Sequence, residues 1–129
     1  MNLMAFFSHP IITALRYGQL LIAICLYCYF ALSGLQSSPL AYSDSALHFL
    51  GNIFIFMSFW LATCLRFKLY FQFFVTLPFA AFIEVAQIFS ASRQFDLNDM
   101  LFNFLGLGVG IIICFFIKRT FLNTQLHNK

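Results

Sequence analysis

The sequence predicts an all-α, polytopic membrane protein with four transmembrane helices and with both termini in the cytoplasm. Composition and hydropathy pattern lead to this fold class. Of the 129 residues, 62% are hydrophobic and only 9% are charged, whereas an ordinary soluble domain is roughly 25% charged. Four apolar runs are long enough to cross a hydrocarbon core of about 30 Å, which takes about 20 helical residues. Because backbone groups in lipid must bond within their own segment, these runs are predicted to be helices.

The four predicted helices form one membrane domain that covers residues 1–129. They span approximately residues 17–35, 49–65, 69–89 and 100–117. The connections between them are too short for a second domain. The first run is expected to stay as an anchor, because the stretch before Arg16 is itself apolar and no small-residue cleavage pattern follows Leu35. Ser8-His9-Pro10 can start this helix early, because Pro tolerates a first-turn position.

The positions of Lys and Arg predict the orientation in the membrane. The residues that flank the predicted helices on one side are Arg16, Arg66, Lys68, Lys118, Arg119 and Lys129. These ends are predicted to face the cytoplasm. The linker 36–47 has no basic residue and the linker 90–99 has one Arg against two Asp, so both are predicted to face outward. The net charge of +3 reflects this orientation and is no argument for a nucleic-acid partner.

Cysteines and glycines inside the apolar runs are predicted to serve packing. Cys25 and Cys28 have the spacing of a redox or metal motif, but they lie mid-helix among apolar residues, where a thiolate is costly. All four cysteines are therefore predicted to act as small hydrophobic side chains, and no chemistry is assigned to them. Gly106 and Gly110 form a small-xxx-small pair, which allows two helices to approach closely.

Polar residues from three predicted helices converge on the outward side of the membrane. They form three sets, each with the spacing of one helix face: Asp44, His48 and Asn52; Glu84 and Gln87; Asp99 and Asn103. Because the orientation is predicted from Lys and Arg alone, this convergence is an independent observation. Glu84 is predicted to lie about 8 Å below the end of its run, at 1.5 Å per residue. A carboxylate at that depth demands a partner, and Arg93 and His48 are the available ones.

These polar residues are candidates for catalysis or for ligand binding. The catalytic candidates are Glu84, His48 and Asp99. The ligand-binding candidates are Asp44, Gln87, Arg93, Asp96 and Asn103. Structural roles are the alternative: Asp96 can cap the last predicted helix, and Asp99 can lie in its first turn. Interhelical hydrogen bonds that only hold the bundle are the corresponding alternative for His48, Asn52, Gln87 and Asn103.

The order and spacing of these residues resemble one family. The motifs are Asp44-x-x-x-His48, Glu84-x-x-Gln87 and Arg93-x-x-Asp96-x-x-Asp99-x-x-x-Asn103-x-x-Gly106. They are similar to those of the VanZ-like family of small bacterial integral membrane proteins, over residues 44–110. Family members commonly have Lys after the Asp of the first motif, where this chain has Ser45. The resemblance implies a multi-pass protein of the bacterial cytoplasmic (inner) membrane, in a family named for an accessory protein of teicoplanin resistance.

An envelope setting favours a pocket that binds or processes an anionic envelope lipid, a cell-wall precursor or a glycopolymer. Arg93 would hold a phosphate or carboxylate through its planar fork, and Glu84 with His48 would serve as an acid/base pair. Whether the chain is an enzyme stays open. The alternative is a structural or accessory subunit, in which the polar residues only hold the helices together. Lipid-facing Phe residues would then contact another membrane protein or a second copy.

Two further hypotheses concern ions. No cofactor is predicted, but Glu84, Asp96 and Asp99 could hold Mg²⁺ or Ca²⁺ through carboxylate oxygens. One outward His and no outward Cys argue against zinc. A proton-relay or transport role would use a titrating Glu84, but nothing polar is predicted to continue from Glu84 or Asn52 to the cytoplasmic side. The lipid bilayer is the partner that composition by itself implies.

Overall fold

The computed structural model describes residues 3–33, 44–89 and 96–127, which form five helices and contain no strand. The helices are α1 (Leu3–Ser8), α2 (Pro10–Leu32), α3 (Asp44–Thr63), α4 (Leu69–Gln87) and α5 (Leu97–His127). Four of these helices, α2 to α5, are long and apolar enough to cross a membrane. The prediction of an all-α protein with four membrane-spanning helices is confirmed.

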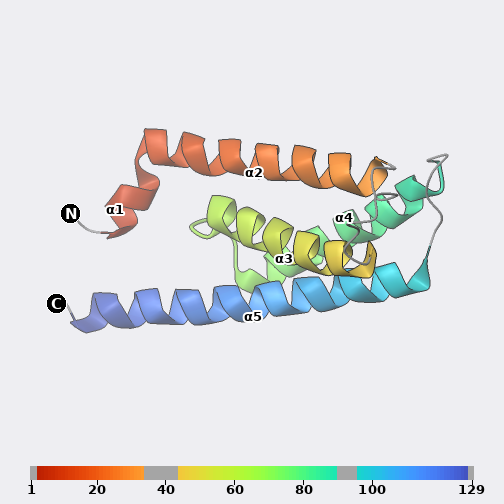
Figure 1. Cartoon of the computed structure of the whole chain (residues 1–129). Coiled ribbons are helices and arrows are strands. Elements are labelled where there is room, and N and C mark those ends of the chain that lie inside the picture. The colour runs from red at the N-terminus through yellow and green to blue at the C-terminus, as the bar shows by residue number, and fades with distance from the viewer. Residues whose placement is uncertain (1–2, 34–43, 90–95, 128–129) are drawn as a thin grey trace.

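The four long helices run alternately up and down, so the first and last described helices bring both chain ends to one end of the bundle (Figure 1). At the opposite end lie the last turn of α2, the first turn of α3, the last turn of α4 and the first turn of α5. Helix α3 packs against α2, α4 and α5, and most extensively against α5. The start of α1 and the end of α5 thus lie at the same end of the bundle, while the cytoplasmic location of the two termini stays a prediction.

Several helices extend beyond their predicted limits. Helix α2 begins at Pro10 with His9 as its N-cap, which confirms the early start that Ser8-His9-Pro10 predicts. Helix α3 already begins at Asp44, and α5 continues to His127 instead of ending near residue 117. The prediction located only the hydrocarbon-spanning part of each helix, whereas backbone hydrogen bonding continues into the polar residues at the helix ends.

The apolar core is small, and much of the apolar surface faces outward. Two buried clusters fill the bundle: one consists of Ala23, Tyr27, Ala31, Ile55 and Ile83, and the other of Phe56, Ala80, Leu107 and Cys114. The four cysteines are free, and Cys114 is a buried core residue, as its predicted role as a small hydrophobic side chain requires. Outward-facing Phe and Leu side chains, such as Phe74 at 65% exposure, present an apolar surface that suits lipid.

Glycines allow α5 to approach α3 closely. A Cβ atom on Gly106 would collide with the carbonyl oxygen of Phe49, and one on Gly110 would lie 3.0 Å from the Cβ of Phe56. Gly108, on the same helix, has open space where its Cβ would be. The pair Gly106 and Gly110 thus serves the close helix packing that its spacing predicts.

Arg16 ties α2 to the end of α3. Its side chain is buried, and its Nε and Nη2 atoms donate to the carbonyl oxygens of Leu61 (2.6 Å) and Ala62 (2.7 Å) in the last turn of α3. Its Nη1 atom donates to the carbonyl of Phe7 in α1, at 2.9 Å. Carbonyls in the last turn of a helix lack intrahelical partners, and they favour a positive charge. Arg16 is therefore a cap for α3 as well as a basic residue at a helix end.

Replacing Arg16 with Gln is expected to lower the free energy of unfolding by about 1–2 kcal/mol, because the last carbonyls of α3 lose a charged donor. Unfolding in mixed detergent micelles, followed by far-ultraviolet circular dichroism, measures this loss. The matched control is Arg66→Gln, which removes an exposed charge near the same helix end. Equal stability of the two variants would contradict the capping role.

Candidate functional site

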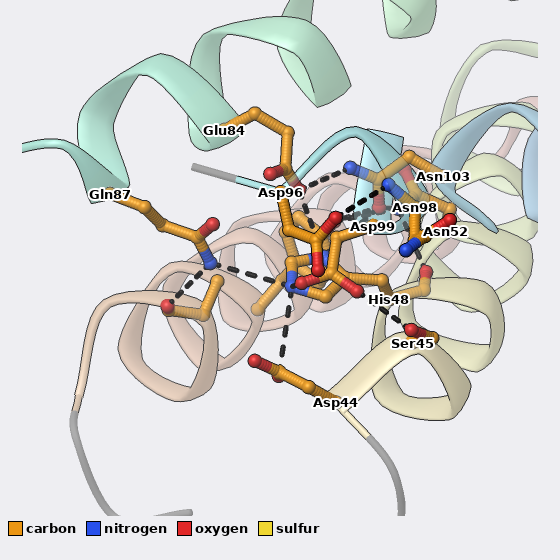
Figure 2. Close-up of polar contacts among 12 residues, drawn as sticks. Asp44, Ser45, His48, Asn52, Glu84, Gln87, Asp96, Asn98, Asp99 and Asn103 are labelled. Atoms are coloured by element: carbon orange, nitrogen blue, oxygen red, sulfur yellow. Dashed lines mark hydrogen bonds and ion pairs between the residues drawn. The ribbon is translucent and has the colours of Figure 1, made fainter. Parts of the chain in front are cut away.

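Nine polar side chains gather at the end of the bundle opposite the chain termini, and we call them the polar cluster. They are Tyr27 of α2; Asp44, Ser45, His48 and Asn52 of α3; Glu84 and Gln87 of α4; and Asp99 and Asn103 of α5. Figure 2 shows the side chains of α3, α4 and α5 pointing toward one another. Helical spacing produces this arrangement, since each set lies on one face of its helix.

Asn103 is the hub of the polar cluster. Its Nδ2 atom donates to Oε1 of Glu84 at 2.6 Å, while its Oδ1 atom lies 3.1 Å from Nδ1 of His48. The same Oδ1 accepts a hydrogen bond from Asn52 and lies 3.4 Å from the hydroxyl of Tyr27. Asn103 is only 1% exposed. One buried side chain of α5 thus contacts the three other long helices.

His48 lies between two groups of acids. Its Nδ1 atom is 3.2 Å from Oε1 of Glu84, and its Nε2 atom is 3.8 Å from Oδ1 of Asp44 and 3.7 Å from Oδ2 of Asp99. The Nε2 atom also lies 3.4 Å from Nε2 of Gln87. Nδ1 faces the oxygens of Glu84 and Asn103, so an N–H at Nδ1 can donate to either of them, and a ring with its single proton there would present the Nε2 lone pair to Asp44 and Asp99.

The polar cluster is rich in negative charge for so buried a site. Glu84 is fully buried, and its Oε2 atom has no hydrogen-bond partner among the described residues. Asp99 is 5% exposed, whereas the side chain of Asp44 is 40% exposed and lies at the rim. Arg93, the basic partner predicted for Glu84, lies outside the described residues. Within the described part of the chain, three carboxyl groups therefore face a single histidine.

The comparison with protein families supplies the classification. The family model for VanZ/LLP1 matches residues 3–118. These residues include α1 to α4 and the part of α5 up to residue 118. The chain belongs to the VanZ/LLP1 family. This confirms the resemblance found in residues 44–110 and extends it to α1 and α2. No curated protein and no solved structure matched the chain.

Most sequence-predicted site residues of this VanZ/LLP1-family protein meet in the polar cluster, but Asp96 does not. Asp96 is exposed, precedes α5 and accepts a hydrogen bond from the backbone N–H of Asn98 at 2.8 Å. This is the geometry of the capping role predicted as its alternative. Gln87 belongs to the cluster and also donates to the carbonyl of Ala31 in α2, at 3.0 Å. The functional roles of these residues remain predictions.

Sequence reasoning missed Tyr27 and Ser45. The hydroxyl of Tyr27 accepts a hydrogen bond from Asn52 at 2.6 Å, and the hydroxyl of Ser45 donates to Oδ1 of Asp99 at 2.8 Å. A signal for Tyr27 exists, because the small residues Ala23 and Ala31 lie one turn away on either side and mark the buried face of α2. Ser45 carries no comparable signal, since its contact with Asp99 depends on how α3 and α5 pack.

A groove between α2 and α3 reaches the polar cluster from the apolar surface of the VanZ/LLP1-family bundle. Its volume is about 250 Å³, and its lining residues are Ala23, Leu26, Tyr27, Phe30, Ala31, Leu47, His48, Leu50, Gly51 and Phe54. Leu26, Phe30, Leu50 and Phe54 are exposed, so the groove opens where lipid would contact the protein. His48 lines the groove and also lies within 4 Å of Asp44, Glu84 and Asp99.

Buried polar residues also lie in the other half of the bundle, but among the described residues they do not continue the path from Glu84 or Asn52. Gln72 and Thr76 are buried in the other half of α4, and Nε2 of Gln72 donates to the hydroxyl of Thr63 at 3.0 Å. A buried apolar layer that includes Phe56, Ala80 and Leu107 separates these residues from the polar cluster, and Ala80 lies one turn from both Thr76 and Glu84. The two polar groups are thus not connected through side chains of the described residues.

Proposed function

We propose that this VanZ/LLP1-family protein binds an anionic lipid-linked envelope precursor or envelope lipid from the outer leaflet of the bacterial inner membrane. A lipid chain would lie in the groove between α2 and α3, and the head group would lie at the polar cluster. The observation that carries the proposal is the position of His48. It lines the apolar groove and lies within 4 Å of acids from α3, α4 and α5.

The groove suits an apolar chain. Apart from His48 and the hydroxyl of Tyr27, its lining is aliphatic and aromatic, which is the usual composition of a ligand pocket with a few orienting polar groups. It opens beside exposed apolar side chains of α2 and α3, which are membrane-spanning helices. A ligand can therefore enter sideways from the bilayer without passing through water.

The head-group end offers polar groups at different depths. Asp44 lies at the rim, His48 and Asp99 lie below it, and Glu84 is deepest and fully buried. Arg93 is proposed to hold the anionic group through its planar guanidinium. If the bound molecule is turned over, His48 held by Glu84 is the acid/base pair, with Asp99 beside it. Binding is the function that the described geometry supports best, because Glu84 is fully buried among the described residues.

Filling the groove tests this proposal. Leu50→Trp is expected to reduce retention of a discrete lipid at least about tenfold, as measured by native mass spectrometry of protein released from gently solubilised membranes. Leu105→Trp is the matched control, because Leu105 is also an exposed leucine but lies on α5, away from the groove. Arg93→Lys should also weaken retention. The same bulk phospholipids on all of these proteins would contradict the proposal.

A structural or accessory role is the second candidate, because Asn103 joins four helices through buried hydrogen bonds. Glu84→Gln separates the two functions. The glutamine oxygen can still accept from Asn103 and His48, so a structural cluster predicts unchanged folding and unchanged lipid content. The binding proposal predicts unchanged folding with altered lipid retention. For the structural role, the next search would address a membrane-protein partner or a homo-oligomer.

A further inference from the structure

Three potential metal ligands converge at the rim of the polar cluster. They are one carboxylate oxygen of Asp44, one of Asp99 and a ring nitrogen of His48, and these atoms all lie within 4.8 Å of one another. The Nε2 atom of His48 is 3.8 Å from Oδ1 of Asp44 and 3.7 Å from Oδ2 of Asp99. Two atoms that coordinate one metal at 2.0–2.2 Å lie roughly 3–4.4 Å apart, depending on the angle. The separations from Nε2 therefore match those of atoms that share one ion.

Ordinary hydrogen bonds between Nε2 and the two carboxylates do not explain this arrangement. An N–H···O hydrogen bond measures 2.7–3.2 Å, and both Nε2–carboxylate distances exceed that range. The amide of Gln87 is also 3.4 Å from Nε2 and makes a shorter hydrogen bond, 3.0 Å, to Ala31. His48 is only 3% exposed. The buried Nε2 atom of His48 thus faces two carboxylates at distances longer than those of ordinary hydrogen bonds.

The groups behind these atoms hold them in ligand orientation. Glu84 Oε1 lies 3.2 Å from Nδ1 of His48, where it can accept a hydrogen bond from an Nδ1–H and hold the ring with Nε2 toward Asp44 and Asp99. The hydroxyl of Ser45 donates to Oδ1 of Asp99 and leaves Oδ2 facing the histidine. A carboxylate behind a metal-binding histidine, and a hydrogen bond to the second oxygen of a metal-binding carboxylate, are the usual supports of metal ligands.

We infer that Asp44, His48 and Asp99 bind a divalent transition-metal ion, and that this ion attracts the anionic head group of the ligand. One imidazole nitrogen and two carboxylate oxygens can bind Mn²⁺ or Zn²⁺, and the single histidine without a cysteine, which argues against zinc, favours Mn²⁺. Three protein ligands leave at least one coordination position open. These ligands differ from those that the sequence analysis considered for a metal ion, which were Glu84, Asp96 and Asp99. In the structure Glu84 contacts the far side of the His48 ring, and Asp96 lies at the exposed start of α5.

Charge explains why an anion would need this ion. Two carboxylates and a neutral imidazole carry a charge of −2, which a divalent cation balances. Without the cation, the carboxylates would repel an anionic head group, and burial would strengthen that repulsion. With it, a phosphate or carboxylate can occupy the open position. The head-group role rests on the proposed function, whereas the metal site itself does not.

Metal binding is tested on the full chain in detergent micelles, stripped with a chelator and dialysed against Zn²⁺ or Mn²⁺. Elemental analysis is expected to find one ion per chain. Asp44→Asn is expected to weaken binding at least about tenfold and to leave the helix content unchanged, because Asp44 is at the rim. Asp96→Asn is the matched control and should bind like the wild type. No stoichiometric ion, or equal losses in Asp44→Asn and Asp96→Asn, would overturn the metal site.

A second measurement separates the ion from the lipid. Native mass spectra of the wild-type protein are compared with and without chelator. Retention of a discrete anionic lipid only in the presence of metal supports both the ion and its head-group role. Equal retention of the lipid with and without chelator overturns the head-group role of the ion and leaves the proposed function standing. One bound ion without any discrete lipid supports the metal site and overturns the proposed function.

Discussion

Asn103→Leu is expected to lower the free energy of unfolding by about 2–4 kcal/mol, the largest loss among the substitutions considered for this protein. Leucine cannot donate to Glu84 or accept from Asn52, Tyr27 and His48, which Asn103 contacts now. Each interhelical hydrogen bond in a membrane protein contributes on the order of 0.6 kcal/mol. The fully buried carboxyl of Glu84 would also lose its 2.6 Å donor. The measurement is unfolding in mixed micelles followed by far-ultraviolet circular dichroism.

Asn98→Leu is the matched control, since Asn98 is exposed in the first turn of the same helix. It should change stability by less than about 0.5 kcal/mol. The double variant Glu84→Leu with Asn103→Leu should be less destabilised than the sum of the single variants, because it removes the carboxyl that the single Asn103 variant leaves poorly paired. Additive losses in the double variant, or equal stability of the two asparagine variants, would contradict the role of Asn103 as hub.

Gly106→Ala is expected to lower the free energy of unfolding by about 1–3 kcal/mol. The added methyl group would collide with the backbone carbonyl of Phe49, and backbone atoms cannot turn aside as a side chain can. Helices α3 and α5 would have to separate along the most extensive helix contact of the bundle. The same unfolding measurement reports this loss.

Gly108→Ala is the internal control for this prediction. It adds the same methyl group to the same helix, where nothing lies within 4 Å of the new atom. Because Ala forms helices more readily than Gly, the expected change is neutral or a gain of up to about 1 kcal/mol. Gly110→Ala should fall between the two, since its methyl group would meet the side chain of Phe56 at 3.0 Å. Similar stabilities of the Gly106 and Gly108 variants would show that α5 does not need a glycine at residue 106.

Hydropathy and helical periodicity predict the number of membrane-spanning helices and much of the polar cluster. Lipid cannot bond to backbone groups, so long apolar runs have to be helices, and their number follows from hydropathy. Once an up-and-down order is assumed, polar residues spaced by one turn, such as Asp44 and His48 or Asp99 and Asn103, must lie at the same end and on one face of each helix. The family motifs run through the same positions, which is why classification succeeded from residues 44–110.

The contacts between individual polar atoms depend on how the helices pack and could not be predicted from the sequence. Helical periodicity places a side chain on a face, but the rotation of each helix against its neighbours sets the distances between partners some 50 residues apart, such as His48 and Asn103. Packing thus brought Tyr27 and Ser45 into the cluster, left Asp96 outside it, and turned Nε2 of His48 toward Asp44 and Asp99. It also made Arg16 a cap for α3, because a side chain's contacts depend on the neighbouring helix as well as on its own.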